Sequence, residues 1–174
     1  MIKKHRLELG LVQLYTGDGK GKTTAALGAA LRVLGWGFKV YFIQFLKGKS
    51  VLKEGAFEAL KKNFNFKHKA FGRGSFIIGK PSERDYEEAK KALELSRKVI
   101  MSGGYDLVVL DEITHAINLK LIAMEEVLAL IKNRPKKVEL ILTGRDAPEQ
   151  LVEVADLVTE MKMVQGKASN INGY

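Results

Sequence analysis

The stretch Tyr15-Thr-Gly-Asp-Gly-Lys-Gly-Lys-Thr-Thr24 places three glycines and two lysines directly after a short apolar run, residues 11–15. The residues that follow it, 21–34, carry apolar side chains at the spacing of a helix with one buried side. Such a loop between a strand and a helix is typical of phosphate-binding loops, because glycines let backbone N–H groups approach phosphate oxygens. The N-terminus of the helix adds partial positive charge. The stretch therefore predicts binding of a phosphorylated nucleotide.

The side chains of this loop have separate expected roles. Lys22 is expected to bridge the terminal phosphates, and the Thr23 hydroxyl is expected to ligate Mg²⁺. Thr16 departs from the usual pattern G-x-x-x-x-G-K-[ST], but Gly17 and Gly19 keep the loop permissive. The expected nucleotide-binding residues are Gly17, Asp18, Gly19, Lys20, Gly21, Lys22, Thr23 and Thr24.

A second strand-like run, residues 105–110, ends in two acids, Asp111 and Glu112. In phosphate-loop proteins a carboxylate at this point holds Mg²⁺ directly or through water, and the spacing does not separate the two residues. We therefore expect Thr23, Asp111 and Glu112 at the metal, and Lys22, Thr23 and Glu112 as the catalytic groups. Glu112 is included because it could orient a nucleophile. The alternative is that both acids are structural, at the start of a helix.

Strand-like and helix-like segments alternate along the chain. Strands are expected at residues 11–15, 38–45, 64–71, 105–110, 138–143 and 157–164, and helices at 21–34, 49–62, 82–101, 125–132 and 148–155. This alternation predicts a three-layer α/β fold of the P-loop NTPase type, a mostly parallel sheet with helices on both faces, in a single domain over residues 1–174. Ligands of such sheets lie at the carboxyl ends of the strands, so residues 16–23, 44–48, 111–112 and 143–146 are expected along one edge.

The composition is that of a globular chain of 174 residues with a net charge of +9 and no cysteine. The lack of cysteine excludes disulfides, thiolate metal sites and cysteine nucleophiles. No apolar run approaches the ~20 residues of a membrane span, and the N-terminus lacks a secretory h-region, so a cytoplasmic location is expected. Residues 47–80 hold nine Lys or Arg against two Glu. That basic segment fits nucleic acid, an anionic small molecule or a solvated surface.

Six blocks occur in one order and together strongly resemble the ATP:corrinoid adenosyltransferases of the phosphate-loop type. The blocks are residues 15–26, 44–48, 110–114, 133–135, 143–147 and 155–161. The resemblance implies a RecA-like fold, a homodimer, and ATP with Mg²⁺ or a similar divalent ion. It also implies a reduced corrinoid as co-substrate: cobalamin, cobinamide or a cobyrinic acid derivative. A flavin-type electron donor is a further candidate partner, whereas a nucleic acid is not expected.

The resemblance also implies a reaction, in adenosylcobalamin biosynthesis or salvage. In this family the Co(I) of the corrinoid attacks the 5′-carbon of ATP, and the whole triphosphate leaves. Cobalt is then the nucleophile, so no protein base is required, and the loop stabilises the leaving group. Family members crowd out the lower cobalt ligand with bulky side chains, for which Phe71 and Phe76 are the expected residues here.

The chain departs from the family at its ends. Residues 165–174 form an atypical tail without the usual His-containing segment, and only about ten residues precede the first expected strand. Both differences concern corrinoid affinity and specificity and do not affect ATP binding.

Three alternative functions stay open. They are an ATPase or kinase acting at the γ-phosphate, a RecA-type nucleic-acid-binding ATPase suggested by the basic segment at residues 47–80, and a carrier or sensor that binds adenosylcorrinoid without turnover.

Overall fold

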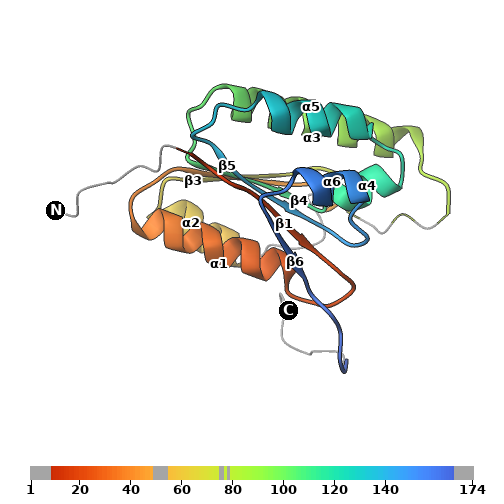
Figure 1. The fold of residues 1–174 in the computed structure, drawn as a ribbon, viewed down its shortest axis with the longest axis horizontal. Helices are drawn as coiled ribbons and strands as arrows, with labels where there is room; N and C mark the ends of the chain where they lie inside the picture. Colours follow the sequence, from red (N-terminus) through yellow and green to blue (C-terminus); the bar gives the residue numbers. More distant parts are fainter. Residues whose placement is uncertain (1–8, 49–54, 75–76, 78, 167–174) are drawn as a thin grey trace.

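The computed structural model in Figure 1 describes residues 9–48, 55–74, 77 and 79–166. These residues form one sheet of six parallel strands in the order β3-β2-β4-β5-β1-β6. The strands are β1 (Val12–Thr16), β2 (Val40–Gln44), β3 (Phe66–Ala70), β4 (Leu107–Asp111), β5 (Glu139–Thr143) and β6 (Leu157–Glu160). The predicted parallel sheet is confirmed.

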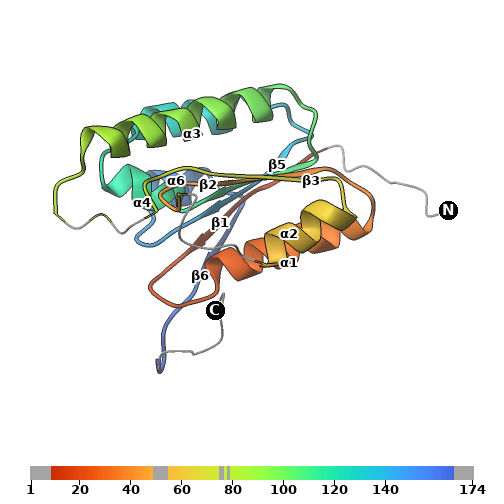
Figure 2. The same cartoon turned by 180° about the vertical axis from the view of Figure 1, so that it is seen from behind.

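Helices cover both faces of the sheet, as predicted. On one face lie α1 (Lys22–Gly35) and α2 (Gly55–Asn63), which Figure 1 shows below the sheet and Figure 2 shows from behind. On the other face lie α3 (Glu83–Met101), α4 (Ile113–Asn118), α5 (Met124–Asn133) and α6 (Glu149–Val154). The arrangement is a three-layer α/β fold.

Successive residues of the central strands fill two separate cores. In β4, Val108 and Leu110 belong to the core under α3 and α5, while Leu107 and Val109 belong to the core under α1 and α2. All four are fully buried or nearly so. A parallel strand buried on both faces reads as a continuous apolar run, which is why this strand was recognisable in the sequence.

Within the described residues most expected elements are shifted at their ends by one or two residues, and two differences are larger. Helix α4 was not predicted, because its six residues are too short for a periodic pattern and its preceding residue, Glu112, forms no side-chain cap. Strand β6 ends at Glu160 rather than at residue 164, because Met161 turns to pair with the loop after β1. The first part of the helix expected at 49–62 lies outside the described residues.

The described helices include none that is long and apolar enough to cross a membrane. The carboxyl ends of β1, β2, β4 and β5 all lie at one edge of the sheet, because the strands are parallel. The segments expected to meet at one edge therefore do so.

Candidate functional site

Lys22 is the first residue of α1, and its side chain folds back over the loop after β1. Its Nζ donates to the carbonyl oxygens of Gly17 and Gly19, both at 2.7 Å, and the side chain is 7% exposed. Burial and the nearby Arg145 guanidinium lower the pKa of Lys22. The ammonium therefore lies inside the loop, beside backbone groups that would face a phosphate.

The glycines of the loop allow close contact with the end of β6. A Cβ added to Gly19 would lie 2.6 Å from the Met161 carbonyl oxygen, and the Gly19 amide donates to that same oxygen at 2.7 Å. Gly17 has a φ of 96°, which disfavours other residues. The Thr16 hydroxyl accepts a hydrogen bond of 3.1 Å from the Ala147 amide. The departure from the usual loop pattern thus links the loop to the segment after β5.

Asp111 lies at the centre of the site, at the end of β4, and is fully buried. Its Oδ1 accepts from the Thr23 hydroxyl at 2.9 Å and from the Thr143 hydroxyl at 2.7 Å. Its Oδ2 accepts from Gln44 Nε2 at 3.0 Å. Three strand ends and the first turn of α1 therefore meet on one carboxylate, and both carboxylate oxygens have protein donors.

The hydrogen-bond network continues to the edge of the sheet through His68 of β3. His68 Nε2 lies 2.8 Å from Gln44 Oε1, and its ring stacks on Phe57 at 3.9 Å between centroids. Burial, and then the charge of Lys61, lowers the pKa of His68 to about 4, so the ring is neutral at neutral pH. Since Gln44 donates to Asp111 through its nitrogen, His68 is the donor to the Gln44 oxygen.

Glu112 differs sharply from its neighbour Asp111. It has a φ of 63° and a ψ of 21°, the left-handed region that costs a non-glycine residue about 1 kcal/mol or more. Its amide donates to the Thr143 hydroxyl at 3.0 Å. Its side chain is 25% exposed, with Lys47 Nζ at 3.9 Å. Tertiary contacts therefore hold Glu112 in a strained conformation with its carboxylate at the surface of the site.

The structure brings Thr23, Asp111 and Glu112 together, but it distributes the other expected residues more widely. Asp18 and Lys20 are exposed on the loop, and Thr24 is exposed in the first turn of α1. Phe71 is buried in the core that contains α3. Phe76 lies outside the described residues. The roles of all these residues in binding stay predictions.

Gln44, Thr143 and His68 were missed as site residues. Gln44 and Thr143 are each the last residue of a strand. Their position predicted that their segments lie at this edge of the sheet, but it did not predict that their side chains donate hydrogen bonds to Asp111. For His68 no signal was visible, because its partners are 11 and 24 positions away on other elements.

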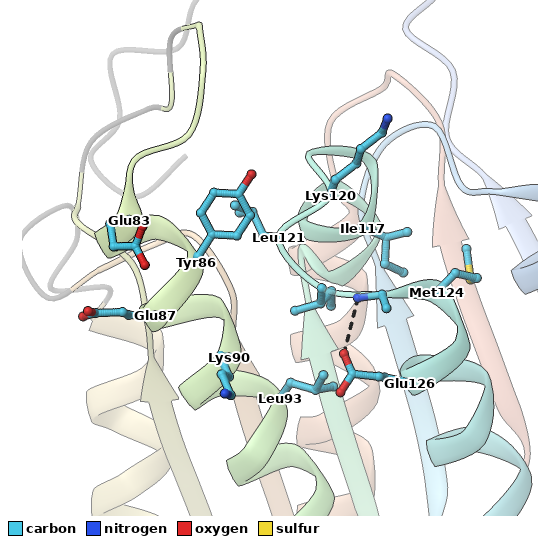
Figure 3. Close-up of a pocket in the computed structure, with 12 residues that line it drawn as sticks. Glu83, Tyr86, Glu87, Lys90, Leu93, Ile117, Lys120, Leu121, Met124 and Glu126 are labelled. Carbon is cyan, nitrogen blue, oxygen red and sulfur yellow. Dashed lines mark hydrogen bonds between the residues drawn. The ribbon is translucent and has the colours of Figure 1, made fainter.

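Two hollows lie in the outer parts of this region. One, of about 600 Å³, borders the loop at Thr16–Asp18 and is also lined by Glu160 and Lys162. The other, of about 830 Å³, lies between α3 and the α4–α5 connection, with Tyr86 and Lys120 at its rim (Figure 3). The second hollow contains none of the expected site residues.

Residues 8–172 match the sequence profile of the ATP:corrinoid adenosyltransferase family BtuR/CobO/CobP. The chain belongs to this family. Two corrinoid adenosyltransferases are similar over most of the chain: that of Sinorhizobium sp. is 36% identical over 161 residues, and that of Pseudomonas aeruginosa is 34% identical over 166. These matches cover 91% and 94% of this chain and 74% and 80% of the relatives.

A third relative is much longer than this chain. An uncharacterized protein of Nostoc sp. is 37% identical over 173 residues, which are 92% of this chain but only 46% of the Nostoc protein. The chain therefore spans about half the length of that relative.

Solved structures show the fold of this adenosyltransferase family member to be RecA-like. A KaiC-like protein of Pyrococcus horikoshii OT3 superposes with a TM-score of 0.57 at 21% identity, covering 94% of this chain and 76% of that one. The RadB recombinase superposes with a TM-score of 0.55 at 17% identity, covering 91% and 77%. At these identities the likeness concerns the fold alone.

Proposed function

We propose that this protein transfers the 5′-deoxyadenosyl group of ATP to the Co(I) centre of a reduced corrinoid. The electron pair of Co(I) attacks C5′ and forms the Co–C bond, and the C5′–O bond breaks. Its electron pair leaves with the triphosphate, and cobalt becomes formally Co(III). Co(I) is formed beforehand, when a reductant of the flavin class passes one electron to the Co(II) corrinoid and is itself oxidised by one electron. Membership of the family over residues 8–172, with a phosphate loop at the expected edge, carries this proposal.

The loop acts on the leaving group. The Lys22 side chain already lies within the loop, where its ammonium donates hydrogen bonds to the carbonyl oxygens of Gly17 and Gly19. In the nucleotide complex these contacts give way to triphosphate oxygens, with backbone N–H groups beside them. Fixed donors at a site where negative charge develops lower the barrier without reorganising at the moment of reaction. The carboxylates of the site need not remove a proton, because the nucleophile is the cobalt of the substrate.

The residues present fit Mg²⁺ as the accompanying ion. Thr23, Asp111 and Glu112 offer oxygen donors, which suit a hard cation. The described residues contain no group of three or more His, Cys, Asp or Glu able to hold a metal, in keeping with an ion that retains waters and substrate phosphates. When bound, Mg²⁺ neutralises charge on the triphosphate. Asp111 would act on a bound ion through the Thr23 hydroxyl, because both its oxygens already accept hydrogen bonds from the protein, and the more exposed Glu112 would be open to the ion.

The metal assignment is tested by the Mg²⁺ dependence of turnover. Thr23→Val removes the hydroxyl at constant shape and is expected to raise the Mg²⁺ concentration for half-maximal activity by roughly ten- to a hundredfold. Thr23→Ser keeps the hydroxyl and serves as the matched control. Equal Mg²⁺ dependence in all three proteins would remove Thr23 from the metal site.

Further features of the proposal follow from the family. We assign Phe71 and Phe76 to the part of the site that binds the corrinoid, where they would crowd out the lower cobalt ligand. Phe71 lines a pocket at the end of β3. We also propose a homodimer and a cytoplasmic location.

The deciding experiment is incubation of the protein with ATP, Mg²⁺ and a chemically reduced corrinoid without oxygen, followed by absorbance. Formation of the Co–C spectrum with one triphosphate released per adenosylcorrinoid is the expected result. Release of ADP with an unchanged corrinoid spectrum would instead indicate chemistry at the γ-phosphate. Hydrolysis stimulated by a polynucleotide would indicate a RecA-type ATPase, and binding of both ligands without turnover a carrier.

A further inference from the structure

A pocket of about 510 Å³ opens at the carboxyl end of β3, between that edge strand and the first turns of α3. Four cationic side chains line it, against a single carboxylate, that of Glu88. The four are Lys69, Arg73, Arg84 and Lys91. Lys69 and Arg73 belong to the basic segment at residues 47–80. This segment lies outside the expected phosphate-binding loop, so nucleotide binding by that loop does not explain its positive charge.

Two of the cations are held in place by acids. Arg73 donates through Nε to the buried Asp85 at 2.7 Å, which leaves four of the five guanidinium N–H donors. Lys91 pairs with Glu88 at 2.8 Å, and this contact holds the pKa of Glu88 below its usual range. Arg73 is therefore held by a buried acid and Lys91 by a surface ion pair, and the positive charge of the pocket exceeds what these two acids neutralise.

The other two cations carry the excess. Among the described residues Arg84 forms no hydrogen bond or ion pair, and the ammonium of Lys69 lies 6.0 Å from the centroid of the Phe71 ring. Cations gathered around a hollow repel one another unless an anion joins them. Their arrangement favours a ligand with negative charge.

The pocket lies at the same edge of the sheet as the phosphate loop. Four strand spacings, roughly 19 Å, separate β3 from β1. The Phe71 amide donates to the Gln44 carbonyl oxygen at 2.9 Å, so the pocket wall is tied to a residue that contacts Asp111. A corrinoid is wide and flat. If its cobalt lies next to C5′ of ATP above the strand ends, the periphery of the macrocycle would extend toward β3.

We propose that this pocket binds an anionic group on the periphery of the corrinoid, and that the protein therefore favours acidic corrinoids over neutral ones. The inference rests on the proposed function. The anion has two chemical sources, a free carboxylate on a side chain of the macrocycle and the phosphodiester of a nucleotide loop. Both offer oxygens to guanidinium and ammonium donors.

Three reduced corrinoids separate these sources in steady-state adenosylation. A cobyrinic acid diamide carries free carboxylates, cobalamin carries a phosphodiester, and a fully amidated cobinamide carries neither. The variant Lys69→Gln/Arg84→Gln neutralises the two cations that, among the described residues, form no hydrogen bond or ion pair with an acid. The exposed Lys98→Gln, in the last turn of α3, is the matched control.

We expect KM for the carboxylate corrinoid to rise about tenfold in the double variant, the scale of two partly exposed charge contacts. KM for ATP, kcat, and KM for cobinamide should stay unchanged, as should all constants of Lys98→Gln. A rise for cobalamin alone would assign the pocket to the phosphodiester, which also supports an anion site.

Equal KM values for the three corrinoids, unaffected by the double variant, would overturn the inference while leaving adenosyl transfer intact. The inference would also be overturned if the wild type bound single-stranded DNA and the double variant lost this binding while its corrinoid kinetics stayed unchanged. Failure of the proposed function has a different signature, because no Co–C spectrum would then form with any of the three corrinoids.

Discussion

Asp111 and Glu112 are adjacent carboxylates with opposite environments. Asp111 is fully buried, and its two oxygens accept hydrogen bonds from Thr23, Thr143 and Gln44. Glu112 is partly exposed, strained at a φ of 63°, and lies near Lys47. Non-glycine residues held in this region cluster at functional sites, because the surrounding structure must support the cost. Under the proposed function, Asp111 would position Thr23 and Glu112 would face the ligands.

Replacing the strained Glu112 should change stability and activity in opposite directions. Glu112→Gly relieves the left-handed conformation and should raise the free energy of unfolding by about 0.5–1 kcal/mol, while adenosylation falls at least about tenfold. Lys120, at a φ of 56° outside the site, provides the control. Lys120→Gly should stabilise similarly and keep full activity. Urea unfolding and turnover measure the two effects; a fully active Glu112→Gly would remove this carboxylate from the mechanism.

At the scale of elements, side chains join the ends of neighbouring strands. His68 of β3 donates to Gln44 of β2, and Gln44 donates to Asp111 of β4. Thr143 of β5 completes the row by donating to the same carboxylate. Buried polar networks of this kind stabilise one arrangement only when every member is satisfied. The row therefore sets the orientation of Asp111 from the edge of the sheet inward.

Acid should weaken this row through His68. Its pKa is about 4 in the folded protein and about 6.5 when unfolded, so between these values the unfolded chain binds more protons. Stability should therefore fall as the pH drops from 6.5 toward 4, by about 1–2 kcal/mol after allowing for partial exposure, and stay level above 7. His68→Phe keeps the stacking on Phe57 and lacks the titrating ring.

Urea unfolding at pH 7.5 and pH 4.5 measures this effect. The wild type should lose more stability between the two pH values than His68→Phe does, since other acids titrate in both. The same loss in both proteins would show that His68 does not contribute to the acid sensitivity.

For the molecule as a whole, the sheet order brings distant segments to one edge of the sheet, where we propose that ATP binds. The phosphate loop follows β1, the two acids follow β4, and β5 lies between them in the sheet. Nucleotide bound at that edge contacts only the folded chain, because the unfolded chain does not assemble these segments. Binding is therefore coupled to global stability.

MgATP at 100 times its dissociation constant should stabilise the fold by about 2.7 kcal/mol, which raises Tm by about 2–4 °C per kcal/mol for a chain of this size. Lys22→Ala should lose this shift together with adenosylation, whereas Lys98→Gln should keep both. Calorimetry with and without MgATP measures the shift. A wild-type shift in Lys22→Ala would place the nucleotide elsewhere.

The sequence by itself determined the parallel α/β architecture, the glycine-rich loop between β1 and α1, and the position of the acids at the end of β4. These features depend on local patterns, such as apolar runs, helical spacing and the glycines around Lys22. Helix α4 was too short for such a pattern. Only the tertiary structure decided the different environments of Asp111 and Glu112, the partners of His68, and the pocket around Arg84. The reason is physical: each depends on which strands are neighbours, and strand order follows from long-range packing rather than from the periodicity of any one segment.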